Sequence, residues 1–284
     1  QAETAKEIFD KASEILGFSM PELCFEKNDR LDITEYTQPA MVTASIAMMK
    51  VFMERTGITP SVAAGLSLGE YPAMVAAGVM SAEDAIRTVR QRGILMQEAV
   101  PAGVGAMSAV LAMDGEKIEE VIAPIDGVQI ANYNCPGQIV ISGKKEAVDE
   151  AAVKLKEAGA KRVLPLNVSG PFHSSLLEEA GEKLGEVLAQ VEVHTPVIPY
   201  IANVTAGYVT DAGDVKPLLI KQVSSSVRWE QSIRRMLEDG VDTFIEIGPG
   251  RTLTGFMKKI DRNAKAMNIE KLEDIEKVKE ALGC

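Results

Sequence analysis

Residues 65–69 read Gly-Leu-Ser-Leu-Gly, a G-x-S-x-G pattern between a short apolar run at 61–65 and a segment with helical patterning at 69–77. When a strand turns sharply into a helix, the central residue is strained and its hydroxyl is exposed, while flanking glycines let the backbones pass closely. Ser67 would then lie at a helix N-terminus, where N–H groups stabilise a developing oxyanion. The pattern predicts a nucleophile elbow with the Leu68 N–H as one oxyanion donor. The alternative is a glycine-rich turn that serves packing alone.

The rest of the chain alternates helical and extended patterns, which indicates an α/β protein. Apolar residues recur at helical spacing in residues 4–16, 37–56 and 81–99. The middle of the chain changes rhythm and gives the order β-α-β-β-α-β, typical of a ferredoxin-like unit, at 106–113, 115–123, 128–132, 138–142, 144–158 and 161–166. We therefore expect a small subdomain inserted into a larger α/β body. That body resumes with helices at 174–188 and 229–237 and strands within 197–203 and at 243–247.

Charge and composition restrict the partners of this chain. The formal net charge is −11 over 284 residues, which argues against nucleic acid as a partner. No apolar run approaches the roughly 18 residues that a membrane span needs. Three cysteines lie far apart without metal-ligand spacing, as expected of reduced thiols in a cytoplasmic protein. With only two histidines, a multi-histidine metal site is not expected either.

A serine nucleophile needs a base, and His173 is the better of the two candidates. It lies in a loop leading into a helix and follows Ser67 in the chain, whereas His194 is interpreted as solvated. No acidic residue between Ser67 and His173 is well placed as a third member. The sequence therefore predicts a dyad whose histidine is oriented by another group.

Two arginines flank the apolar face of the predicted helix at 81–99. A half-buried guanidinium is best matched by a carboxylate, so Arg90 or Arg92 could bind an acidic ligand. Alternatively, both side chains extend to solvent along the helix surface. Periodicity alone does not choose between the two arginines.

Five ordered motifs carry a resemblance that covers nearly the whole chain. They are Gly65-Leu66-Ser67-Leu68-Gly69-Glu70-Tyr71, Gln91-Arg92-Gly93 with Met96-Gln97, Asn132-Tyr133-Asn134-Cys135-Pro136-Gly137-Gln138, Pro171-Phe172-His173-Ser174 and Glu246-Ile247-Gly248-Pro249-Gly250. The chain resembles the malonyl-CoA:acyl carrier protein transacylases of type II fatty acid synthesis. The resemblance implies an α/β-hydrolase-like large subdomain of residues 1–102 and 168–284, and a ferredoxin-like small subdomain of residues 103–167.

The resemblance also implies the chemistry and the residues that perform it. A malonyl group would pass from malonyl-CoA to Ser67 and then to the phosphopantetheine thiol of acyl carrier protein, with His173 as base. Arg92 would hold the malonyl carboxylate, and the backbone carbonyl of Gln222 would orient His173. Phe172 matches the form associated with malonyl groups. No metal or bound cofactor is implied.

The carrier protein is acidic in this family, so we expect a local basic patch to receive it despite the net charge. Lys258, Lys259 and Arg262, close to the turn at 248–250, are the candidates. The alternative interpretation is a solvated helix face.

Two departures from the family pattern keep other functions open. Leu66 stands where the family usually has histidine, and nothing matches the family's first strand and its Gly-Gln-Gly-Ser-Gln-like loop, which supplies a second oxyanion donor. We expect that segment to exist outside the given sequence. The alternatives are a serine thioesterase or other hydrolase, which needs no buried arginine, and an inactive binding protein if the strand is truly missing.

Overall fold

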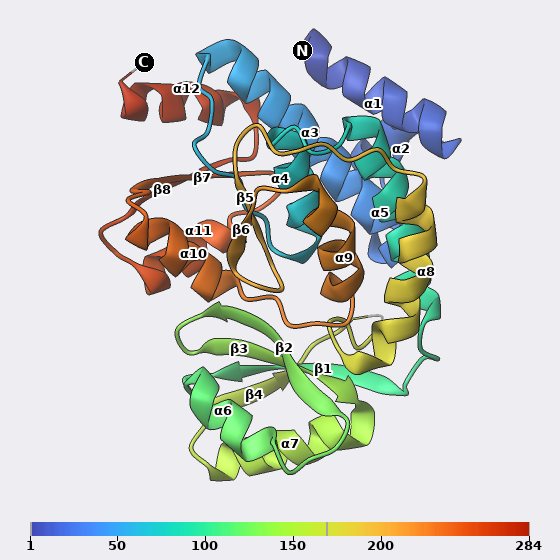
Figure 1. Cartoon of the computed structure of the whole chain (residues 1–284), viewed down its shortest axis with the longest axis vertical. Coiled ribbons are helices and arrows are strands. Elements are labelled where there is room, and N and C mark those ends of the chain that lie inside the picture. Colours follow the sequence, from blue (N-terminus) through green and yellow to red (C-terminus); the bar gives the residue numbers. More distant parts are fainter. Residues whose placement is uncertain (1, 169, 284) are drawn as a thin grey trace.

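The computed structural model describes residues 2–168 and 170–283, which form a helix-rich upper part and a lower part built on a four-stranded sheet (Figure 1). The upper part begins with α1 (Glu3–Leu16), α2 (Met20–Phe25), α3 (Thr34–Thr56), α4 (Glu70–Ala76) and α5 (Ala82–Glu98). Helices α1 and α3 end at Gly17 and Gly57, both in the left-handed conformation that glycine adopts without strain. Helix α5 begins after Ser81, whose hydroxyl accepts a hydrogen bond from the Asp84 N–H at 3.0 Å.

The lower part confirms the predicted β-α-β-β-α-β order. Its elements are β1 (Gly105–Leu111), α6 (Gly115–Ile122), β2 (Val128–Cys135), β3 (Gln138–Lys144), α7 (Lys145–Glu157) and β4 (Arg162–Pro165). The strands pair antiparallel in the order β2-β3-β1-β4. One face is covered by α6 and α7, which bury Ile118, Val148 and Leu155 in a core shared with the strands (Figure 1). The α/β fold class is confirmed, and the subdomain boundaries at 102/103 and 167/168 stay a prediction.

In the part of the chain that the structure describes, the strands of the upper part form two two-stranded sheets. β5 (Tyr200–Ala202) runs antiparallel to β6 (Gly207–Val209), and β7 (Thr243–Ile247) runs parallel to β8 (Lys265–Ile269). The strand predicted at 61–65 is present only as an isolated bridge between Ala63 and Tyr200. Its main-chain hydrogen bonds join Ala63 to Pro199 and Ile201, and the chain then turns into the elbow within two residues, so a longer ladder does not form.

The remaining helices complete the upper part and bring it against the lower one. They are α8 (Glu178–Ala189), preceded by a 3-10 turn at Ser175–Leu177, α9 (Ala212–Gln222), α10 (Trp229–Glu238), α11 (Thr252–Ile260) and α12 (Leu272–Leu282). The segment before α10 joins the lower sheet, because Val227 exchanges backbone hydrogen bonds with Ala131 and Tyr133 of β2 at 2.8 and 2.9 Å. No helix within the described residues is long and apolar enough to cross a lipid bilayer.

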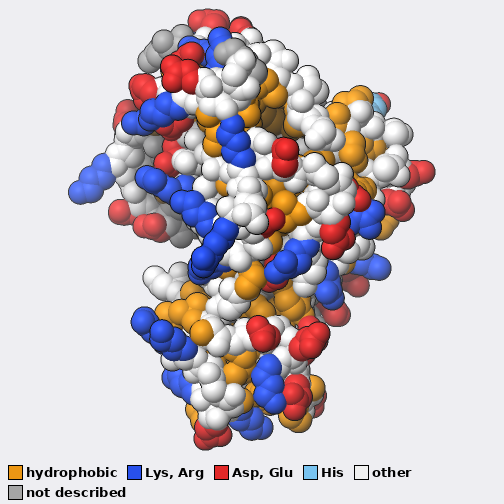
Figure 2. Space-filling model, turned by 90° about the vertical axis from the view of Figure 1, so that its left-hand side faces the viewer, with side chains coloured by type: hydrophobic (Ala, Val, Ile, Leu, Met, Phe, Trp, Pro, Cys, Tyr) orange, Lys and Arg blue, Asp and Glu red, His pale blue; other side chains and the backbone are white. Residues whose placement is uncertain are grey.

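The face that carries α10 and α11 is shown in Figure 2. Lys and Arg side chains gather there at the level where the upper and lower parts meet. Acidic side chains are spread more widely over the same face. Positive charge is therefore concentrated locally on this face, although the net charge of the chain is negative.

Candidate active site

The elbow around Ser67 has the strained geometry that its sequence predicts. Ser67 has a φ of 50° and begins a 3-10 turn, Ser67–Gly69, that continues into α4. A Cβ on Gly65 would lie 1.9 Å from the carbonyl oxygen of Gly69, so the two backbone segments can approach this closely only without a side chain there. Asn203 stabilises the turn with two hydrogen bonds. Its Oδ1 accepts from the Ser67 N–H at 2.5 Å, and its Nδ2 donates to the Gly65 carbonyl oxygen at 2.7 Å.

His173 lies against Ser67. Its Nε2 is 2.7 Å from the Ser67 Oγ, and its Nδ1 is 2.8 Å from the backbone carbonyl oxygen of Gln222. Because a carbonyl oxygen only accepts, Nδ1 carries the proton and Nε2 presents its lone pair to the serine hydroxyl. The backbone of His173 is also left-handed, with a φ of 56°, and Gln129 of β2 donates to its carbonyl oxygen at 3.1 Å. The lower sheet thus helps to hold the loop that carries the imidazole.

The surroundings of His173 keep its imidazole neutral. Its side chain is buried, and burial, followed by the nearby charge of Arg92, lowers the pKa of His173 to about 4. At neutral pH the ring is therefore in the form that accepts a proton. Geometry and protonation state both suit a general base.

The two arginines of α5 have different environments. Arg90 forms an ion pair with Glu35 at 2.7 Å, and its guanidinium lies 4.3 Å from the centre of the Tyr36 ring. Arg92 is only 1% exposed. Its Nη2 donates to the Ser67 Oγ at 3.2 Å and to the Gln222 Oε1 at 3.0 Å. Arg92 therefore lies beside the predicted nucleophile, Ser67, whereas Arg90 is paired with Glu35.

Among the described residues, the guanidinium of Arg92 has no direct counter-ion. Its Nη1 donates to the side-chain oxygen of Gln38 at 2.9 Å, and its buried Nε has no hydrogen-bond partner. No described carboxylate comes within ion-pair distance of Arg92. Burying a guanidinium is costly unless an anion or sufficient acceptors compensate its charge. The cluster is consequently suited to a ligand whose carboxylate approaches Arg92 next to Ser67.

Three polar residues of this cluster were not singled out from the sequence. Gln38 is a buried polar residue within the otherwise very apolar α3, which was a usable signal. Glu70 follows the elbow directly and is 1% exposed, and burial raises the pKa of its carboxyl to about 7. Asn203 follows β5 and carries no comparable signal, because its role depends on contacts with residues 136 or more positions away.

The other predicted residues lie around the cluster or away from it. The Leu68 N–H belongs to the first turn at the elbow, where backbone donors lack partners from a preceding turn. Lys258 and Lys259, at the end of α11, and Arg262 just beyond it are exposed and are not part of the cluster. Lys259 donates to Gln138 at the start of β3 at 3.2 Å.

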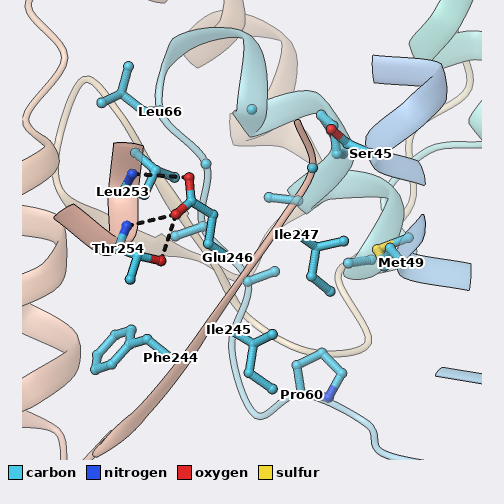
Figure 3. Close-up of a pocket in the computed structure, with 18 of the residues that line it drawn as sticks. Ser45, Met49, Pro60, Leu66, Phe244, Ile245, Glu246, Ile247, Leu253 and Thr254 are labelled. Carbon is cyan, nitrogen blue, oxygen red and sulfur yellow. Dashed lines mark hydrogen bonds between the residues drawn. The ribbon is translucent and has the colours of Figure 1, made fainter. Parts of the chain in front are cut away.

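A cavity of about 790 Å³ lies on another side of the elbow (Figure 3). It extends between the segment 60–66 and β7, and its labelled walls include Leu66, Ile245 and Ile247. The carboxylate of Glu246 is already bonded to the start of α11, where it accepts from the Leu253 and Thr254 N–H groups at 3.0 and 2.7 Å. Neither Ser67, Arg92 nor His173 lines this cavity. Leu66, where the resemblance expects histidine, thus lines an apolar cavity beside the reacting groups.

Comparison with known proteins shows which family the chain belongs to. Residues 3–277 match the family model described as acyl transferase domain. The malonyl CoA-acyl carrier protein transacylase of Bacillus subtilis is 49% identical over 281 residues, which are 97% of this chain and 88% of the relative.

Solved structures agree over the same length. The acyl carrier protein S-malonyltransferase of Vibrio cholerae superposes with a TM-score of 0.95 at 42% identity, covering 98% of this chain and 92% of that chain. A complex of a type II polyketide acyl-carrier protein with its malonyl-transacylase gives a TM-score of 0.95 at 39% identity, covering 99% and 92%. The resemblance drawn from the five motifs is confirmed, and the chain belongs to the acyl transferase domain family.

Proposed function

We propose that this protein is a malonyl-CoA:acyl carrier protein transacylase, which moves a malonyl group through a seryl ester on Ser67. The names of the relatives support the substrate pair, and one of the similar solved structures contains a carrier protein. The observation that carries the proposal is Arg92, buried without a carboxylate partner and 3.2 Å from the nucleophilic oxygen. A malonyl group supplies the missing carboxylate on a thioester small enough to reach Ser67.

In the first half-reaction, the Nε2 of His173 takes the proton of the Ser67 hydroxyl while the oxygen attacks the thioester carbonyl. The carbonyl oxygen becomes an oxyanion, which the Leu68 N–H stabilises. The carbon–sulfur bond then breaks, and His173 returns the proton to the sulfur, so coenzyme A leaves as a thiol. The hydrogen bond from Nδ1 to the Gln222 carbonyl stabilises the charged imidazole in between.

In the second half-reaction, the phosphopantetheine thiol of the carrier protein takes the place of coenzyme A. His173 accepts the thiol proton, and the thiolate attacks the seryl ester. When the ester bond breaks, His173 returns the proton to Ser67 and the free enzyme is restored. The malonyl carboxylate stays on Arg92 through both halves, so the acyl carbon keeps its position relative to the nucleophile.

We assign the docking of the carrier protein to the basic patch of Lys258, Lys259 and Arg262. All three are exposed at the end of α11 or just beyond it, and the hydrogen bond from Lys259 to Gln138 places this end of α11 against the lower part. Reversing the charge of Lys258 and Arg262 with glutamate is expected to raise the KM for carrier protein about 5- to 10-fold at low salt, because exposed charges act mainly on encounter. Malonylation of Ser67 by malonyl-CoA should stay unchanged. An unchanged KM for carrier protein would contradict the proposed docking role of the patch.

We place the reaction in the cytoplasm, consistent with the unpaired thiols of Cys24 and Cys135. Fractionation of the producing cell with antibody detection tests this, and recovery with an exported fraction would contradict it.

Intact-mass measurement after incubation with malonyl-CoA tests the enzymatic proposal. The wild-type chain should gain one malonyl group, and Ser67→Ala should gain none. Transfer to carrier protein is then compared with the release of free malonate. Dominant release would favour the hydrolase alternative.

Arg92→Ala tests the carboxylate clamp. We expect malonyl transfer to fall about 10- to 100-fold, the effect of losing a hydrogen bond to a charged group, while acetyl transfer changes little. Arg90→Ala is the matched control on the same helix and should leave the malonyl-to-acetyl ratio unaltered, because Arg90 is paired with Glu35. Equal losses with both acyl groups in Arg92→Ala would count against the clamp.

A further inference from the structure

Glu70 is a buried carboxyl group next to the catalytic cluster that the mechanism above does not use. It is the first residue of α4, three positions after the nucleophile, and is 1% exposed. Its Oε2 accepts hydrogen bonds from the Gln222 Nε2 at 2.7 Å and from the Asn203 backbone N–H at 3.2 Å. Glu70 is thus bonded to the residues that hold the reacting groups and to none of the reacting groups themselves.

The carboxyl of Glu70 is one of three groups that fix which way the Gln222 amide faces. The Gln222 Nε2 donates to Glu70 and also to the Ser67 carbonyl oxygen at 2.9 Å. The amide oxygen is therefore left for Arg92, whose Nη2 donates to it at 3.0 Å. A flipped amide would bring two donors together at Arg92 and two acceptors together at Glu70, which is unfavourable on both sides.

Gln222 also carries the backbone carbonyl that receives the His173 Nδ1–H at 2.8 Å. It is fully buried and is the last residue of α9. One residue therefore bonds to the base through its main chain and to the arginine through its side chain. Whatever fixes the amide of Gln222 fixes the relative positions of His173 and Arg92.

We propose that Glu70 is a positioning residue for the acyl transfer: it holds Gln222 so that the base and the carboxylate-binding arginine meet at Ser67. This inference rests on the roles proposed above for Ser67, His173 and Arg92. Because both hydrogen bonds reach a single oxygen of Glu70, a neutral amide at this position can accept both.

Glu70→Gln and Glu70→Met form the matched pair for the test, since methionine has a similar length without the acceptor. Glu70→Gln should keep kcat for malonyl transfer within about 3-fold of the wild type. Glu70→Met should lower kcat about 10- to 100-fold, because small displacements of reacting groups are costly. It should also lower the malonyl-to-acetyl ratio, which loss of packing alone would not change. Thermal unfolding checks that both variants are folded.

The proposal is overturned if folded Glu70→Met transfers malonyl as fast as Glu70→Gln, or if both variants lose kcat equally with an unaltered acyl ratio. Should Glu70→Met not fold, Glu70→Asp replaces it, because it retains the charge and withdraws the acceptor oxygen. The same loss of kcat and acyl ratio is then expected, and wild-type values overturn the proposal. Ser67→Ala and Arg92→Ala are measured in parallel: if both keep wild-type malonyl transfer, the proposed function fails, whereas if both lose malonyl transfer as expected and Glu70→Met does not, only the role of Glu70 fails.

Discussion

Neighbouring strands of the four-stranded sheet are bonded through their main chains over long runs, whereas the catalytic cluster is bonded through side chains of residues far apart in the sequence. β1 pairs with β3 at every position from Gly105 to Leu111. Around the nucleophile, by contrast, the bond from the Gln222 side chain to the Ser67 carbonyl joins residues 155 positions apart. The stability of the sheet is distributed over many similar main-chain contacts, whereas the arrangement of the cluster depends on a few specific side-chain hydrogen bonds.

Replacing the base should have the largest effect of the changes that follow. His173→Ala is expected to lower malonylation of Ser67 about 10²- to 10⁴-fold, the range for a general base. The wild-type rate should also fall as the pH drops through about 4, the pKa of His173, because the protonated ring cannot accept the serine proton. Stopped-flow acylation between pH 3.5 and 8 measures both effects. A fall centred at or above pH 6 would contradict the neutral, buried imidazole.

The two glycines of the elbow should respond very differently. Gly65→Ala places a Cβ 1.9 Å from the Gly69 carbonyl oxygen, so the turn must open and acylation is expected to fall about 100-fold or more. Gly69→Ala meets no atom within 4 Å and should cost less than about 5-fold. Acylation rates and thermal unfolding of both variants provide the measurement. Similar losses at the two positions would show that the close contact at Gly65 is not what the pattern requires.

The smallest effect on activity is expected in the lower sheet. Leu155 of α7 is fully buried in the core of the lower part. Leu155→Ala should lower the free energy of unfolding by about 2–5 kcal/mol through the cavity it leaves. Transfer by the folded protein should stay within about 2-fold of the wild type, because the hydrogen bonds that join Ser67, Arg92, His173 and Gln222 involve no residue of that core. Chemical unfolding and kcat are measured side by side, and a large loss of kcat in the folded variant would erase the contrast between sheet and cluster.

The same contrast explains what the sequence could predict. The pattern from 106 to 166 predicted every element of the lower part, because each strand and helix is set by neighbouring residues and ended by a local turn. In the upper part, β7 was predicted at 243–247, but α9, α11, α12 and β8 were not. The apolar run at 61–65 was predicted as a strand, but it forms only a single bridge, and its only described strand partner is a three-residue segment.

The cluster itself was predictable to different depths. Local pattern predicted the strained serine at residue 67, and chain order favoured His173. Periodicity could not separate Arg90 from Arg92, because the difference lies in Glu35 and Gln222, which belong to other elements. The role of the Gln222 carbonyl was predicted only from the family resemblance, because every residue type carries a main-chain carbonyl. Glu70 is part of the elbow motif, but the burial of its side chain could not be predicted because burial depends on the tertiary structure.

Gln222 contacts His173 through its main chain and Arg92 through its side chain, and these two contacts respond differently to substitution. Every amino acid has a backbone carbonyl oxygen. A substitution at position 222 therefore changes the side-chain amide but keeps the acceptor for the His173 imidazole, as long as the end of α9 keeps its conformation. The same substitution also removes the amide contacts with Arg92, Glu70 and the Ser67 carbonyl. A descendant that exchanged this glutamine would keep the acceptor for its imidazole but would have to hold its arginine and its nucleophile in place by other contacts.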